Sequence, residues 1–172
     1  MSTIQELANP FHAYIFGTSF WYFLRGIMRI IDPETVIAWF RPPSQAFMTA
    51  NDLEIYTTWT DGFGLLTLSM LLLALADTLP LPGQLRGSSL SSAGSSETKR
   101  PFARAAVLIT MFHHVTTGIG AYQHWVKPSH RTVAMDIGVY GNIGLTVLGV
   151  VALMTSLKDE DEVVVKKRGK KA

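Results

Sequence analysis

The sequence contains no cysteine in its 172 residues. This absence excludes disulfide bonds, thiolate zinc sites, iron–sulfur clusters and cysteine nucleophiles. The chain also lacks a glycine-rich phosphate loop, the nucleophile elbow of hydrolases and the HExxH helix of zinc proteases. ATP-driven transport and the common hydrolase mechanisms therefore have no support in the sequence.

Charge is scarce as well. Only 16% of the residues are charged, against roughly 25% in an average soluble domain, and 48% are hydrophobic. The first basic residue is Arg25, too late for the charged start of a cleavable signal peptide. The mean hydropathy of +0.23 favours a protein that is integrated in a membrane, and we expect no nucleic acid among its partners.

Four apolar segments carry this hydropathy, at about 11–31, 62–79, 103–126 and 132–157. Each approaches the ~20 residues that a helix needs to cross a bilayer core. A buried soluble bundle is the alternative, but it would present outer stripes of lysine and glutamate that these segments lack. We therefore predict an all-α fold, a polytopic four-transmembrane-helix bundle spanning residues 1–157. Asn51 is a plausible N-cap, so the second helix is able to start well before residue 62.

The connections predict the topology. Residues 80–101 are rich in glycine and serine and indicate a flexible exposed loop, and residues 158–172 form a charged, disordered tail. Four spans place this loop and both termini on one side, which carries ten basic residues against five on the other. The positive-inside rule makes that side cytosolic. Lys170 and Arg168 near the end resemble a dilysine retrieval signal of the endoplasmic reticulum, with arginine where a second lysine is usual.

On the other side, residues 34–40 are expected to lie as a short interfacial helix. Further along, Glu54 and Asp61 fall on one face of the second helix. These carboxylates either mark a hydrated helix end or belong to a site.

Polar residues also lie deep in the apolar segments. The short KPSHR connection makes the third and fourth segments an antiparallel hairpin, which brings five of them to similar depth: His113, His114, Thr117, Tyr140 and Asn142. Arg25 is expected to pair with Asp136 or Asp61. Such a layer either joins helices through hydrogen bonds or handles a ligand or proton.

Metal and haem binding are not expected. Adjacent histidines on a helix point about 100° apart, and His12 lies too far from the level of His113 for bis-histidine haem ligation. We therefore predict no metal and no cofactor.

Two stretches, IYTTWTDGFGLLTLSMLLLAL and FHHVTTGIGAYQHW, resemble in spacing the second and third spans of the ergosterol-biosynthesis scaffold family of fungal sterol and secondary-metabolite pathways. The resemblance covers about half of the chain. It implies a four-helix protein of the endoplasmic reticulum, and the long first loop and the serine-rich loop depart from the family. No functional residue is carried across.

Two functions follow from these patterns. The first is a cofactor-independent isomerase or cyclase acting on a membrane-dissolved terpenoid, polyketide or sterol by acid–base chemistry. The second is a non-catalytic scaffold that tethers other membrane enzymes of a pathway. For the enzyme, the candidate acids are Asp61, Glu54 and Asp136, the candidate bases are His113, His114 and His124, and the candidate substrate-binding residues are Trp21, Tyr22, Trp59, Tyr140 and Asn142.

Overall fold

The computed structural model describes residues 9–76 and 100–158. The elements follow in the order α2 (Pro10–Ile31), α3 (Pro33–Phe40), the 3-10 turn η1 (Pro43–Gln45), α4 (Asp52–Leu75), α5 (Arg100–Trp125) and α6 (Val133–Thr155). Within these two ranges there is no β-strand, so the predicted all-α class is confirmed.

The long helices match the four predicted apolar segments, with one difference in length. α4 begins at residue 52, ten residues before the apolar segment, because Asn51 and Glu54 form a capping box. The Asn51 side chain accepts from the Glu54 backbone N–H, and the Glu54 carboxylate accepts from the Asn51 backbone N–H, each at 2.9 Å. The predicted flexible loop and charged tail lie, apart from their first or last residues, outside the described residues.

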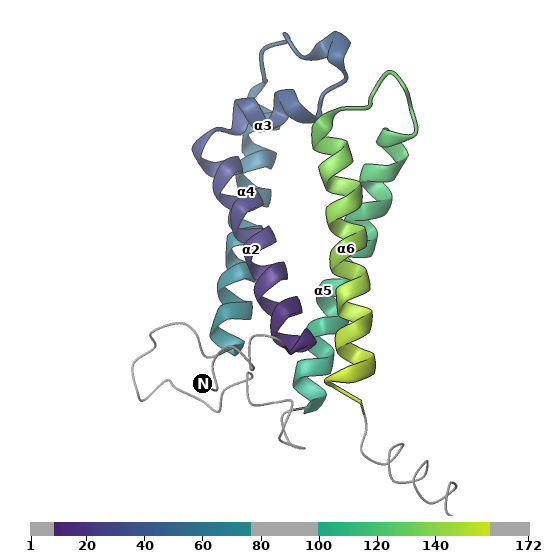
Figure 1. The fold of residues 1–172 in the computed structure, drawn as a ribbon. Helices are drawn as coiled ribbons and strands as arrows, with labels where there is room; N and C mark the ends of the chain where they lie inside the picture. Colours follow the sequence, from purple (N-terminus) through teal and green to yellow (C-terminus); the bar gives the residue numbers. More distant parts are fainter. Residues whose placement is uncertain (1–8, 77–99, 159–172) are drawn as a thin grey trace, which may run out of the picture.

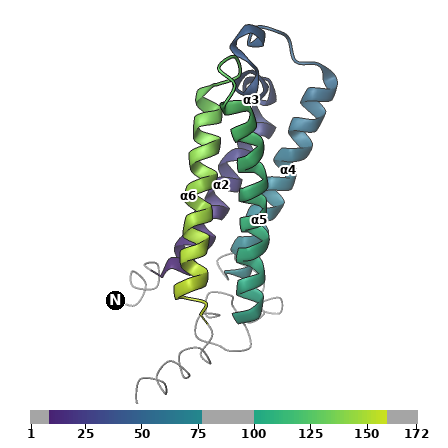
Figure 2. The same ribbon diagram turned by 90° about the vertical axis from the view of Figure 1, so that its right-hand side faces the viewer.

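The four long helices form two pairs (Figure 1). α2 packs along α4, and α5 packs along α6, while contacts between α2 and α6 join the pairs. α3 is the short helix predicted at 34–40, and it lies across the same end of the bundle as the connection between α5 and α6. We call this the α3 end. Figure 2 shows α5 and α6 side by side, with α4 diverging from α5 toward the α3 end.

Small residues allow the helices to approach closely. A Cβ atom at Gly62 of α4 would lie 2.9 Å from Cβ of Arg29 and 3.1 Å from the carbonyl oxygen of Gly26. On the α5–α6 side, Gly118 and Gly138 meet neighbouring side chains as expected for close packing. Gly144 does not, since nothing lies within 4 Å of its added Cβ.

The outer surface of the bundle is apolar. Large side chains such as Ile109 and Phe112 of α5 are 66% and 71% exposed, and similar residues cover the outer faces of the other helices. By length and composition, α4 and α6 are able to cross a membrane. Only 22% of each apolar stretch is buried inside the bundle, whereas the core helix of a soluble protein is mostly buried. α2 and α5 are as long but carry arginine, histidine and other polar residues that lower their hydropathy.

Candidate functional site

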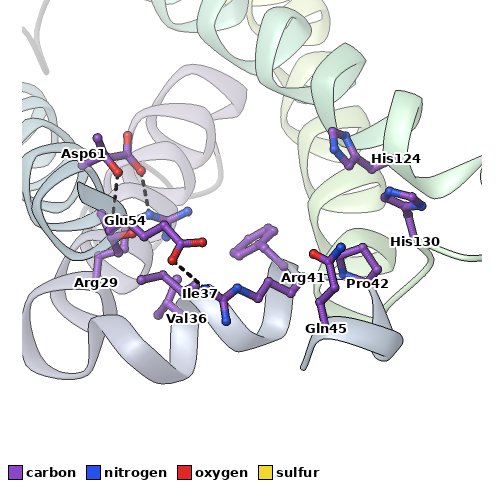
Figure 3. Close-up of a pocket in the computed structure, with 13 residues that line it drawn as sticks. Arg29, Val36, Ile37, Arg41, Pro42, Gln45, Glu54, Asp61, His124 and His130 are labelled. Carbon is purple, nitrogen blue, oxygen red and sulfur yellow. Dashed lines mark hydrogen bonds and ion pairs between the residues drawn. The ribbon is translucent and has the colours of Figure 1, made fainter. Parts of the chain in front are cut away.

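A pocket of about 550 Å³ opens at the α3 end, between the α2–α4 pair and the end of the α5–α6 hairpin (Figure 3). α2, α3, α4 and the connection after α3 form one side, and the end of α5 and the turn after it face them. The lining residues are Arg29, Val36, Ile37, Phe40, Arg41, Pro42, Gln45, Glu54, Thr57, Thr58, Asp61, His124 and His130.

Two ion pairs organise the polar side of the pocket. Arg29 Nε lies 2.6 Å from Asp61 Oδ2, and Arg41 Nη2 lies 2.6 Å from Glu54 Oε2. Both arginines are about nine-tenths buried, whereas the Asp61 carboxylate is 53% exposed. Because Glu54 also caps α4, its carboxylate has a structural role. Asp61 is the more accessible acidic group of the two.

Two imidazoles face this acidic side across the pocket (Figure 3). The ring centroids of His124 and His130 are 5.8 Å apart. His124 Nδ1 bonds the carbonyl oxygen of Gly120 at 3.2 Å, and His130 Nδ1 bonds Ser129 Oγ at 2.9 Å. In the described residues, neither imidazole bonds to a carboxylate on the opposite side of the pocket. The pocket therefore brings a carboxylate and imidazoles together around one volume without joining them directly.

The α3 side of the pocket depends on a helix cap. Asp32 Oδ1 accepts from the backbone N–H of Thr35 at 3.1 Å and starts α3, which carries Val36 and Phe40 to the pocket. Hydrogen bonds from the side chain of Thr35 and, to a smaller extent, from its backbone N–H hold the pKa of the Asp32 carboxyl below its usual range.

The expected pairing of Arg25 was wrong. Arg29, one turn nearer the helix end, takes Asp61, because α2 and α4 approach closely at that level. Asp136 accepts from Arg131 at 3.1 Å and from the Trp125 indole at 2.6 Å, so it closes the α5–α6 turn rather than facing α2.

The predicted polar layer exists in part. His114 is fully buried, and its Nδ1 bonds Asn142 Oδ1 at 3.1 Å while its Nε2 lies 3.4 Å from Thr18 Oγ1. Thr117 donates to the same Asn142 oxygen at 3.2 Å. Tyr140 does not belong to the layer, because its side chain points outward and is 62% exposed. This network joins α2, α5 and α6 and leaves His114 with both nitrogens occupied.

His113 points to a second group of side chains. Its ring lies edge-on against Tyr22, with centroids 5.0 Å apart, and the Arg25 guanidinium lies 5.8 Å from the centre of the Trp21 ring. The Trp21 ring in turn lies against Gly141, where a Cβ would be only 2.6 Å from it. Four buried polar atoms here have no hydrogen-bond partner in the described part of the chain: Trp21 Nε1, Tyr22 OH, Arg25 Nη1 and His113 Nε2. We call these four residues the buried donor cluster.

The sequence-predicted site residues thus fall into separate groups. Asp61, Glu54 and His124 line the pocket; His113, Trp21 and Tyr22 belong to the buried donor cluster; and His114 and Asn142 form the interhelical network. Trp59 is 47% exposed on α4 and, like Tyr140 and Asp136, lies in none of these groups.

Sequence reasoning did not assign Arg29 and Arg41 to any site, and it grouped His130 with His124 and Asp61 or Asp136 only as a surface metal site that no spacing motif requires. For Arg29 a signal was present, since it follows Arg25 by four residues and so lies on the same face of α2. For Arg41 and His130, which are in connections, no periodic pattern gives their direction.

In the described residues, no three histidine, aspartate or glutamate side chains come together in an arrangement for a metal ion. No curated protein and no solved structure matches the chain. A family model does match, over residues 14–171, which include all four long helices except the first turn of α2. The chain therefore belongs to the family described as Domain of unknown function (DUF8792).

Proposed function

We propose that this chain is a four-span membrane protein that binds a lipophilic small molecule and takes part in its biosynthesis, as a cofactor-independent isomerase or cyclase. The observation that carries the proposal is the pocket between the helix pairs, where Asp61 faces two imidazoles at one end of an apolar bundle.

The membrane placement rests on the apolar outer faces of all four long helices. α2 and α5 carry more polar residues than α4 and α6, but their most polar side chains, such as Arg25 and His114, are turned into the bundle. Polar groups inside a span are tolerated when they face protein. The distribution of basic residues favours cytosolic termini.

The proposed chemistry is proton transfer. An Asp61 carboxylate that holds Arg29 is arranged to accept a proton from a substrate, and the two pocket imidazoles are arranged to return one at a second position. This reverses the role of Asp61 as an acid that the sequence suggested. Arg29 would keep the carboxylate in place while the substrate reacts. Such a reaction moves a double bond or closes a ring without a cofactor.

The test is product formation by the purified full chain in nanodiscs, supplied with lipid extracts from cells that lack it. We expect the wild type to convert an accumulated lipophilic intermediate, and Asp61→Asn to lose at least about a hundredfold in rate, as expected for loss of a general base. The matched control is Asp52→Asn, which changes an exposed acidic residue in the first turn of the same helix.

Equal turnover by the Asp61→Asn and Asp52→Asn variants would contradict the assignment of Asp61. No conversion by the wild type, together with co-purification of other membrane enzymes, would favour the second candidate function. That function is the non-catalytic scaffold of sterol or secondary-metabolite pathways to which two stretches of the sequence bear a resemblance.

A further inference from the structure

In the described residues, the buried donor cluster differs from the buried polar contacts that join the middles of the long helices. Tyr14 OH pairs with Thr110 Oγ1 at 2.7 Å, and the hydroxyls of Ser19 and Ser69 pair at 2.9 Å. His114 is also satisfied at both nitrogens. The fold therefore satisfies its interhelical polar groups where their role is to hold helices together.

In the buried donor cluster the same fold leaves polar atoms unsatisfied. The indole N–H of Trp21 and the guanidinium of Arg25 donate only, and the Tyr22 hydroxyl is able to donate. Tyr22 is fully buried, and the accessible area of each of the four polar atoms is close to zero. Leaving a buried donor without an acceptor costs free energy that an oxygen atom of a ligand would recover.

The charges of this region do not balance. Arg25 lies within electrostatic range of Arg29 and Asp61, and Asp61 is already paired with Arg29. These three groups sum to one net positive charge. A cation in the apolar interior of a bundle is stabilised by an anion beside it, and the bidentate geometry of a guanidinium matches a carboxylate.

We propose that the buried donor cluster binds the carboxylate of a lipophilic carboxylic acid. The Arg25 guanidinium supplies the charge, the Trp21 indole and the Tyr22 hydroxyl donate to the carboxylate oxygens, and the His113 imidazole lies beside Tyr22. The inference rests on the proposed function in one respect, that the ligand is a lipophilic small molecule. It adds the chemical class of its polar group.

The position of the cluster favours a free amphiphile over a bilayer phospholipid. Tyr22 is nine residues from the end of α2, or roughly 14 Å along the helix axis. The phosphate of a phospholipid remains at the membrane surface, whereas a fatty acid or a terpenoid acid carries a small head group. The pocket is the nearest opening, since Arg29 in its lining lies one turn along α2 from Arg25.

The test measures binding of radiolabelled oleic acid to the full chain in phosphatidylcholine nanodiscs, with its methyl ester and phosphatidic acid as competitors. We expect the acid to compete at least about tenfold better than either. Tyr22→Phe should weaken binding of the acid about tenfold, the effect of losing one hydrogen bond to a charged group. Arg25→Gln should weaken it further and abolish the preference for the acid over the ester.

Two variants serve as matched controls. Tyr56→Phe changes an exposed tyrosine of α4, and Arg131→Gln changes an arginine at the surface of the α5–α6 turn. Both should bind oleic acid like the wild type. If Arg25→Gln does not fold, Tyr22→Phe still decides, because removing an unpartnered buried hydroxyl should not lower stability.

Equal competition by the acid and the ester, or wild-type binding by Tyr22→Phe, would overturn the inference. Equal competition by phosphatidic acid would replace the free acid with a phospholipid and also overturn it. If the wild type converts its intermediate yet shows no preference for the acid, this inference fails while the proposed function stands.

Discussion

At the scale of single residues, two adjacent histidines have different environments. His114 bonds Asn142 and Thr18 and holds three helices together. His113, one position earlier, turns to Tyr22 and has a buried nitrogen without a partner in the described part of the chain. As neighbours on a helix they leave the axis about 100° apart, so they meet different helices. His114 therefore has a structural role, and His113 belongs to the cluster that we propose binds a ligand.

We predict that Asn142→Leu lowers the free energy of unfolding by about 1–3 kcal/mol, because it leaves the buried Nδ1 of His114 without its partner. The measurement is unfolding of the purified protein in mixed micelles. Tyr140→Phe, on the outward face of the same helix, should change stability by less than about 0.5 kcal/mol. Equal stability of the two variants would show that the network contributes nothing.

A second prediction concerns pH. The pKa of Asp32 is lowered in the folded chain, so its cap stabilises α3 fully above the ordinary value of 3.8 and loses this effect as the pH falls through the lowered pKa. An NMR titration should show the Thr35 amide resonance shifting in that acidic range. In Asp32→Asn, which keeps an acceptor but does not titrate, this shift should be absent. A shift that persists in this variant would assign it to another group.

At the scale of elements, glycine positions determine how closely the helices approach. Gly62 and Gly26 bring α2 and α4 together at the level of the Arg29–Asp61 ion pair. Gly141 admits the Trp21 ring between α2 and α6. The pocket and the buried donor cluster both depend on these two close contacts.

We therefore predict that Gly62→Ala destabilises the bundle by about 1–3 kcal/mol, because the added Cβ meets Arg29, Ile30 and the backbone of Gly26 within 3.1 Å. Gly64→Ala in the same helix meets nothing within 4 Å and should be neutral or stabilising, since alanine favours a helix over glycine. Thermal melts of both variants measure the difference. Melting of Gly62→Ala at or above the temperature of Gly64→Ala would contradict the packing at this contact.

The elements themselves could be predicted from the sequence. Runs of apolar residues, the cap at Asn51 and the short connection at KPSHR were sufficient to give four long helices and the α5–α6 hairpin. The charges that Arg25 and Asp136 meet could not be predicted from the sequence, because the rotation and crossing of the helices decide which of several charges come together. Hydropathy gives depth along a helix but not the direction in which a side chain points.

At the scale of the whole molecule, the bundle is apolar outside as well as in most of its core. Every long helix carries large exposed apolar side chains, and the charged groups of the described residues lie mainly at the two ends of the bundle and between α2 and α4. A soluble bundle differs, because charged side chains cover its outer faces. The arrangement agrees with the placement in a membrane that we propose.

The absence of cysteine makes the topology directly testable. In microsomes, Ser129→Cys in the α5–α6 turn should react with a membrane-impermeant maleimide only after the membrane is opened. Ser95→Cys, in the serine-rich segment, should react in intact microsomes. Labelling of both positions in intact microsomes would contradict four spans with cytosolic termini.

The central claim is that the interior of this bundle receives a lipophilic small molecule. Native mass spectrometry of the full chain, released from nanodiscs assembled with cell lipid extract, tests it most directly. The account predicts an acidic lipophilic ligand retained by the wild type and by Tyr56→Phe, and retained to a much lower extent by Tyr22→Phe. A wild-type spectrum without bound ligand, or equal retention by Tyr22→Phe, would contradict it.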